Sequence, residues 1–130
     1  MSATSDREIA ELDKSLAIDG EDIVLRRVVG TTNQVNIDVG CRAFVRFLQA
    51  EELVGSLIQS DMKVILSPTE ITRAQWPGGQ PVSSAPHQSD PRVPRNSDKI
   101  VVQGKVRMVS FPKPILVDGV LVRIELLATG

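Results

Sequence analysis

The chain has one cysteine and one histidine, which limits the chemistry that it can support. Cys41 falls on the apolar face of the longest alternating segment, and a packed thiol of this kind is unreactive. His87 lies in a loop beside proline and glutamine, with no second metal ligand near it. Zinc sites need several cysteine or histidine ligands, which this chain lacks. We therefore expect no catalytic residue, no metal site and no cofactor, and we interpret the chain as a protein other than an enzyme.

The acidic residues do not form a catalytic pair. Glu51 and Glu52 are adjacent, so they do not face the same way in a helix or in a strand. Thr69 and Glu70 start a short helical pattern, where a capping role outweighs a role for Glu70 as a general acid. The sequence also has no glycine-rich phosphate loop and no serine–histidine–aspartate arrangement. A binding or structural role is the interpretation that these residues leave.

Four arginines and the single tryptophan are the candidates for contacts with a partner. Arg92 and Arg95 lie in a proline-rich loop, where they either keep the loop solvated or present positive charge to a polyanion. Arg42 and Arg46 share one face of a predicted strand, which is either a solvated surface or a contact for an acidic neighbour. Trp76 either anchors the base of the loop to the domain or forms a hot spot between subunits.

Length and composition limit the class of protein. A chain of 130 residues is one domain by the usual length relation, and 42% hydrophobic with 24% charged residues is ordinary for a soluble fold. Aromatic residues make up only 3%, which argues against a surface that stacks single-stranded bases. No apolar run approaches the roughly 20 residues of a membrane span, and the N-terminus has no secretory pattern. We expect no membrane contact.

The charge is unevenly distributed along the chain. The first 22 residues hold seven acids and two bases and so carry −5, which leaves +4 on the rest of a chain whose net charge is −1. Such an acidic start either docks on a basic surface, of its own copy or of a neighbour, or is a solvated helix.

The N-terminal segment predicts a helix. Ser5–Glu8 matches a capping box, and Gly20 stands where a helix would end. Ile9, Leu12 and Leu16 form one apolar stripe at helical spacing. A helix of about fourteen residues is marginal alone in water, so the stripe must pack on the domain or on a neighbouring subunit.

After the helix the apolar period changes to two, which is typical of strands. Strands are predicted over residues 22–29, 35–47, 61–67, 98–103, 106–111 and 120–127, with a short helix over 69–75. Pro112 and Pro114 are expected to bound the fifth strand, and Asp118–Gly119 forms a turn. Residues 76–97 form a long loop with five prolines.

These elements predict a mainly β fold, with a small sandwich as the alternative architecture. We expect a small antiparallel β-barrel of about six strands with an N-terminal helix, a short inner helix and a long proline-rich loop. The acidic helix occupies residues 1–21, and the barrel domain occupies residues 22–130 with the loop over 76–97. The core is small, so contacts with other subunits would help to stabilise it.

Three regions, in this order and spacing, resemble the head–tail joining proteins of long-tailed bacteriophages and prophages. The first is Gly20–Arg27, which precedes a turn and a long alternating strand. The second is Ser67–Ile71, followed by Trp76–Pro77. The third begins at Val93 and ends with the strand around Arg123. The resemblance extends from about Asp19 to Leu127 and rests on short structural motifs.

The resemblance implies a small β-barrel that assembles as a ring in the neck of the virion and has no catalytic residues. A hexamer is expected, with a dodecamer as the alternative. The partners that it implies are the portal or adaptor ring on one side and the tail terminator or tail tube protein on the other. The protein would be made in the cytoplasm of the host bacterium. It would help to retain packaged DNA and would dock the tail.

Within such a ring, the loop is the candidate for the channel or for the contact with the next ring. His87, Arg92 and Arg95 would then face double-stranded DNA or an acidic neighbour. The candidate interface residues are Trp76, Arg42, Arg46, Ile9, Leu12 and Leu16. Two other functions remain open at this point: a tail terminator or other tail-completion ring protein, and a small oligonucleotide-binding barrel.

Overall fold

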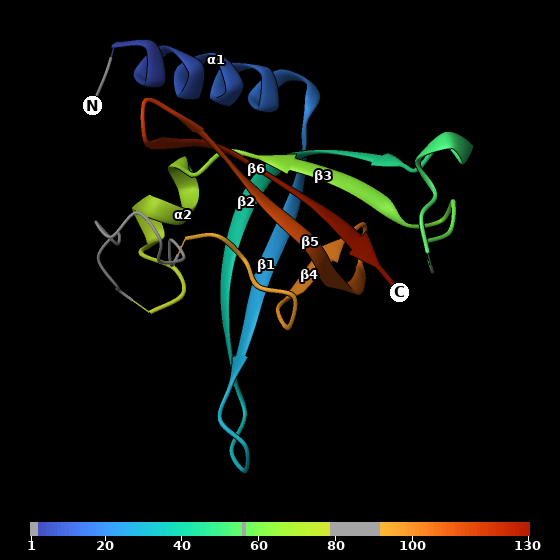
Figure 1. The fold of residues 1–130 in the computed structure, drawn as a ribbon. Helices are drawn as coiled ribbons and strands as arrows, with labels where there is room; N and C mark the ends of the chain where they lie inside the picture. Colours follow the sequence, from blue (N-terminus) through green and yellow to red (C-terminus); the bar gives the residue numbers. More distant parts are fainter. Residues whose placement is uncertain (1–2, 56, 79–91) are drawn as a thin grey trace.

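The computed structural model describes residues 3–55, 57–78 and 92–130, and it shows the predicted mainly β fold (Figure 1). Six strands close into an antiparallel barrel in the order β1-β2-β3-β6-β5-β4, which settles the choice between barrel and sandwich. The elements are α1 (Ala3–Asp19), β1 (Glu21–Val29), β2 (Val35–Phe47), the 3₁₀ turn η1 (Ala50–Glu52), β3 (Met62–Leu66), α2 (Thr69–Ala74), β4 (Lys99–Val102), β5 (Lys105–Val117) and β6 (Val120–Thr129).

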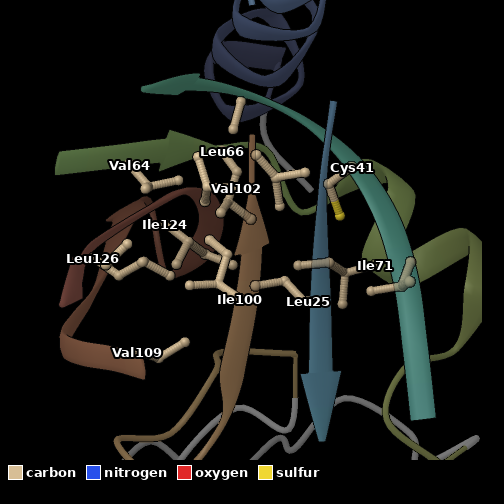
Figure 2. Packing of buried hydrophobic residues seen from close by; sticks show 14 of the residues in the cluster. Leu25, Cys41, Val64, Leu66, Ile71, Ile100, Val102, Val109, Ile124 and Leu126 are labelled. Carbon is tan, nitrogen blue, oxygen red and sulfur yellow. The ribbon is translucent and has the colours of Figure 1, made fainter. Parts of the chain in front are cut away.

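The core lies inside the barrel, where every strand contributes its inward residues (Figure 2). On β1 these are Ile23 and Leu25, and on β2 they are Val39, Cys41 and Ala43. Because side chains alternate between the two faces of a strand, this spacing of two is the pattern that predicted the strands. The burial of this apolar surface is the main favourable term in folding.

The β1–β2 hairpin is longer than the barrel wall that contains it. β1 pairs with β4 only from Ile23 to Arg26, although it pairs with β2 along its whole length. The far end of the hairpin therefore extends away from the barrel (Figure 1). The alternation of β2 predicted an apolar face that is buried throughout, and this is wrong at both ends. Val35 and Phe47 are 56% and 55% exposed because the strand continues beyond the core.

Strand β5 continues through Pro112 and Pro114, so the prediction that these prolines bound the strand is wrong. Its pairing with β6 shifts register between Ser110 and Lys113, and Phe111 has a φ of 50° at this irregularity. β4 pairs with β5 only as far as Met108. Beyond that point β5 has one neighbouring strand, and a residue without an N–H is tolerated on the unpaired side or at a bulge.

The two helices begin differently from the predictions. α1 starts at Ala3, so Ser5 lies buried within the helix instead of capping it. α2 starts at Thr69 with Pro68 at its N-cap position, so the prediction that Thr69 caps the helix is wrong. The N–H of Thr69 donates to Ser67 Oγ at 3.2 Å. The hydroxyl of Thr69 instead donates to Asp13 at 2.7 Å and so joins α2 to α1.

Gly20 ends α1 as predicted, since its N–H donates to the carbonyl oxygen of Leu16 at 2.9 Å. A Cβ at this position would lie 2.5 Å from that oxygen and 3.0 Å from the carbonyl oxygen of Ala43. The close approach of three backbone segments therefore requires glycine here. The turn places α1 against β6 and β2.

A buried ion pair joins β1 to the start of β4. Arg27 donates from Nε and Nη2 to the two carboxylate oxygens of Asp98 at 2.8 and 2.7 Å. The Asp98 side chain is only 2% exposed, and it also accepts the N–H of Arg95 at 2.7 Å. The guanidinium of Arg27 lies 5.1 Å from the centroid of the Trp76 ring, whose Nε1 donates to the carbonyl oxygen of Ile37 at 2.8 Å. The cluster of Arg27, Trp76 and Asp98 thus joins the chain before residue 79 to the chain after residue 91.

We expect Asp98→Ala to lower the free energy of unfolding by about 3–5 kcal/mol, because it leaves the Arg27 guanidinium buried without a partner. Asp38→Ala is the matched control, since Asp38 holds the adjacent Arg26 in the same two-bond geometry at the surface. This control should lose much less, because an ion pair at the surface is screened by water. Urea unfolding measures both, and equal losses would contradict the importance of the buried pair.

Candidate functional site

Trp76 lies in the barrel core of its own chain with 3% of its surface exposed. An intersubunit hot spot needs an accessible ring, so this alternative for Trp76 is wrong for the folded chain. The other alternative, an anchor at the base of the loop, agrees with the hydrogen bond to Ile37 and with the position of Arg27 over the ring. The indole N–H needs a partner once it is buried, and the Ile37 carbonyl supplies it.

Arg42 is also occupied within the chain, and it is therefore not a free interface residue. Its guanidinium donates to the carbonyl oxygens of Leu16 at 3.2 Å and Gly20 at 2.7 Å, and it forms an ion pair with Asp22 at 3.2 Å. α1 has no basic residue in its last turn. Arg42 reaches across from β2 and supplies the positive charge that a helix C-terminus favours.

We expect Arg42→Ala to lower the free energy of unfolding by about 1–3 kcal/mol, because several carbonyl groups lose a charged donor. Arg42→Lys should recover only part of this loss, since one ammonium group cannot reproduce the planar set of donors. Urea unfolding gives the energies, and limited proteolysis within α1 reports whether the helix has detached. An Arg42→Ala protein with unchanged protection of α1 would contradict the capping role.

Arg46 lies at the surface, where its guanidinium donates to both carboxylate oxygens of Glu52 at 2.7 Å. Glu52 also accepts the N–H of Gln49 at 2.9 Å and so holds the turn η1. The hydrogen bonds from Arg46, and after them the one from Gln49, lower the pKa of Glu52 from its ordinary 4.5 to about 2. The charge of Arg46 is thus balanced within the chain.

Because the pKa of Glu52 is lower in the folded chain, its contribution to stability is complete above about pH 4.5 and is lost as the pH falls through about 2. We expect Arg46→Ala to return the pKa of Glu52 toward 4.5, as measured by an NMR titration of its carboxyl group. The difference in stability between the two proteins should be largest above pH 4.5 and should vanish toward pH 2. A midpoint for Glu52 that is the same in both proteins would contradict this.

Cys41 is a packed core residue, as predicted. It is 2% exposed, and burial, with a smaller effect from the negative charge of Glu70, raises the pKa of its thiol to about 12. Glu70 itself accepts the backbone N–H of Arg42 at 3.2 Å, so it joins α2 to β2. A thiol with this pKa is protonated at neutral pH and does not act as a nucleophile.

The apolar stripe of α1 faces the barrel of its own chain. Leu16 is fully buried, while Ile9 and Leu12 are half-buried. Of the two alternatives for the stripe, packing on the domain therefore accounts for Leu16. Leu12 contributes to the wall of a groove between α1 and the barrel.

Of the three residues predicted to line a channel, the structure describes Arg92 and Arg95. Arg92 is half-buried and donates to the hydroxyl of Thr72 on α2 at 3.0 Å. Arg95 is exposed, and its backbone N–H donates to Asp98. His87 and most of the loop around it lie outside the described residues.

The structure shows two exposed apolar regions that the sequence analysis did not single out. One, the hairpin tip, contains Val28, Val29 and Val35 at the end of the β1–β2 hairpin. The other, the Phe111 groove, has a volume of ≈ 470 Å³ and is lined by Ile58 and Phe111, which are 57% and 67% exposed. The positive φ of Phe111 could not be inferred from its type, since large side chains seldom adopt it.

A third region, the α1 groove, lies between α1 and the barrel and has a volume of ≈ 350 Å³. Its apolar part comes from α1, β2, β5 and β6: Leu12, Phe44, Ile115, Val117 and Val122. Glu8, Glu11 and Asp19 of α1 also line it. The groove therefore combines an apolar surface with three carboxylates.

Over residues 3–55, 57–78 and 92–130, no group of three or more histidine, cysteine or acidic side chains is placed to hold a metal ion. The helices in these ranges are too short or too polar to cross a membrane.

No protein-family model and no curated protein matches this chain. The surfaces described above are thus the features from which a function can be argued.

Proposed function

We propose that this protein is a structural component of the neck of a tailed phage particle. It forms a ring between the portal or adaptor and the tail, helps to close the head around packaged DNA, and provides a docking surface for the tail. The observation that carries this proposal is that one small closed barrel exposes apolar residues at separate places, the hairpin tip and the Phe111 groove. The sequence resemblance to head–tail joining proteins supplies the particular assembly.

The hairpin tip supports an interaction role because it extends from the barrel without a core of its own (Figure 1). Residues 28–36 contain no charged side chain, and Val29 lies directly opposite Val35 at its end. An extended ribbon of two strands is marginally stable in water, and contact with a second protein would stabilise it. Grouped apolar residues at such a place are typical of protein–protein contacts.

The Phe111 groove supports a second contact at a different place. Among the described residues that line it, Asp61 has the one charged side chain, and this side chain is buried and accepts the N–H of Ile58 at 3.0 Å. The N–H of Phe111 donates to Asn96 Oδ1 at 3.2 Å, which holds the bulge that directs the aromatic ring outward. A partly exposed aromatic side chain beside a groove with little exposed charge is typical of the centre of an interface. Two such places on one chain favour a protein with several neighbours.

We expect the purified chain to be monomeric or weakly associated alone, and to form rings when it is mixed with the portal or adaptor and tail proteins of the same particle. Native mass measurement of the single protein and of the mixtures tests this. The double variant Val29→Ser with Val35→Ser should weaken one of these complexes at least tenfold, because the tip loses its apolar contact.

Val54→Ser is the matched control, since Val54 is exposed but lies outside both regions, and it should leave the complexes unchanged. A stable dimer that binds neither the portal side nor the tail side would contradict the proposed function. Complexes that form equally well with the tip variant would leave the tip without a role.

A further inference from the structure

The acidic start of the chain and its basic remainder are placed at different parts of the barrel. α1 carries most of the early acids, and Glu8, Glu11 and Asp19 lie along the α1 groove. None of these three forms an ion pair with a base elsewhere in the described ranges. Arg123 also lines the groove, and its guanidinium lies 3.0 Å from Glu125, which Lys63 approaches at 3.7 Å as well. One base thus stands against three acids in the lining of the groove. The groove therefore presents uncompensated negative charge around an apolar surface.

A surface of the opposite character lies on the outer side of β4 and β5. Val101 is directly opposite Val106, and Lys99 is directly opposite Met108, so these four side chains share one face of the barrel wall. Val106 and Met108 are 49% and 47% exposed. We call this face the β4–β5 wall. Lys105, at the turn between the two strands, is exposed and adds a second positive charge to that of the half-buried Lys99. It lies opposite Val102, one position beyond the residues that share the face.

The groove and the wall lie toward opposite ends of β5, so one chain cannot join its own two surfaces. Ile115 and Val117 of β5 line the groove, whereas Val106 and Met108 belong to the wall. The strand between Met108 and Ile115 spans about 20 Å. A contact between them must therefore link different chains, and it joins unlike surfaces. Such a head-to-tail contact builds a ring when its rotation closes.

We propose that the α1 groove receives the β4–β5 wall of a second copy of this chain. Carboxylates of the groove face Lys99 and Lys105 of the neighbour, while Val106 and Met108 pack on the apolar surface around Leu12. The unbranched methionine side chain adapts to an irregular groove. The inference rests on the proposed function, because it identifies the lateral contact of the proposed ring.

Charge reversal tests this contact. We expect Glu11→Lys and Lys99→Glu each to weaken self-association at low salt at least tenfold, because each places like charges together. The double variant, which restores opposite charges in the reverse order, should recover association to within a few-fold of the unchanged protein. Sedimentation velocity over a range of concentrations measures this, and added salt should weaken the association of the unchanged protein.

Glu51→Lys is the matched control, since it makes the same chemical change at an exposed acid outside the groove. It should leave self-association unchanged, and thermal melting confirms that every variant is folded. Single variants that associate like the unchanged protein, a double variant that stays as weak as the single ones, or an unchanged protein that stays monomeric at high concentration and low salt would each overturn the contact. A protein that fails here but still joins portal and tail proteins would retain the proposed function.

Discussion

The buried ion pair between Arg27 and Asp98 is the constraint on which the rest of the arrangement depends. Two charges removed from water destabilise a fold unless each meets the other with good geometry, and here both carboxylate oxygens are used. The pair fixes the start of β4 against β1 just where their strand pairing ends at Arg26 and Lys99. With Trp76 packed beneath the guanidinium, it also determines where the chain enters and leaves the segment between α2 and β4.

The strands of the barrel could be predicted because the apolar pattern of each strand is local in the sequence. The hydrogen-bond partners of Arg27 and Trp76 could not be predicted in this way. Apolar residues at every second position indicated the strands, since each strand turns one face to the same core. Arg26 and Arg27 are adjacent arginines, yet one pairs at the surface and the other in a buried cluster. The difference comes from a carboxylate 71 residues away, and the partner of the Trp76 indole is 39 residues away. No local pattern indicates such partners.

The errors at the ends of elements have the same origin. Pro112 and Pro114 are strand breakers where both edges of a strand are paired, but β5 has lost its β4 neighbour by then. In the sequence, Arg42 and Arg46 are two similar arginines on one strand. In the fold, Arg42 donates to a carbonyl oxygen at the end of α1, whereas Arg46 pairs with Glu52. Residue types therefore define what each side chain can do, and tertiary contacts decide which of these roles it has.

The closed barrel also limits the ways in which a second chain could bind to this one. Because the sheet closes on itself through six strands, its wall has no edge strand, although β2 over residues 35–42 and β5 over residues 109–117 each have a single neighbouring strand. A second chain that meets the closed part of the wall must therefore use side-chain surfaces instead of strand addition. Prolines within the longest unpaired stretch, on β5, further disfavour strand addition there. The remaining surfaces differ in character, since the α1 groove is acidic while the β4–β5 wall is basic and apolar. Surfaces of unlike character at separate places favour head-to-tail contacts over a two-fold dimer, and head-to-tail contacts are the ones from which rings are built.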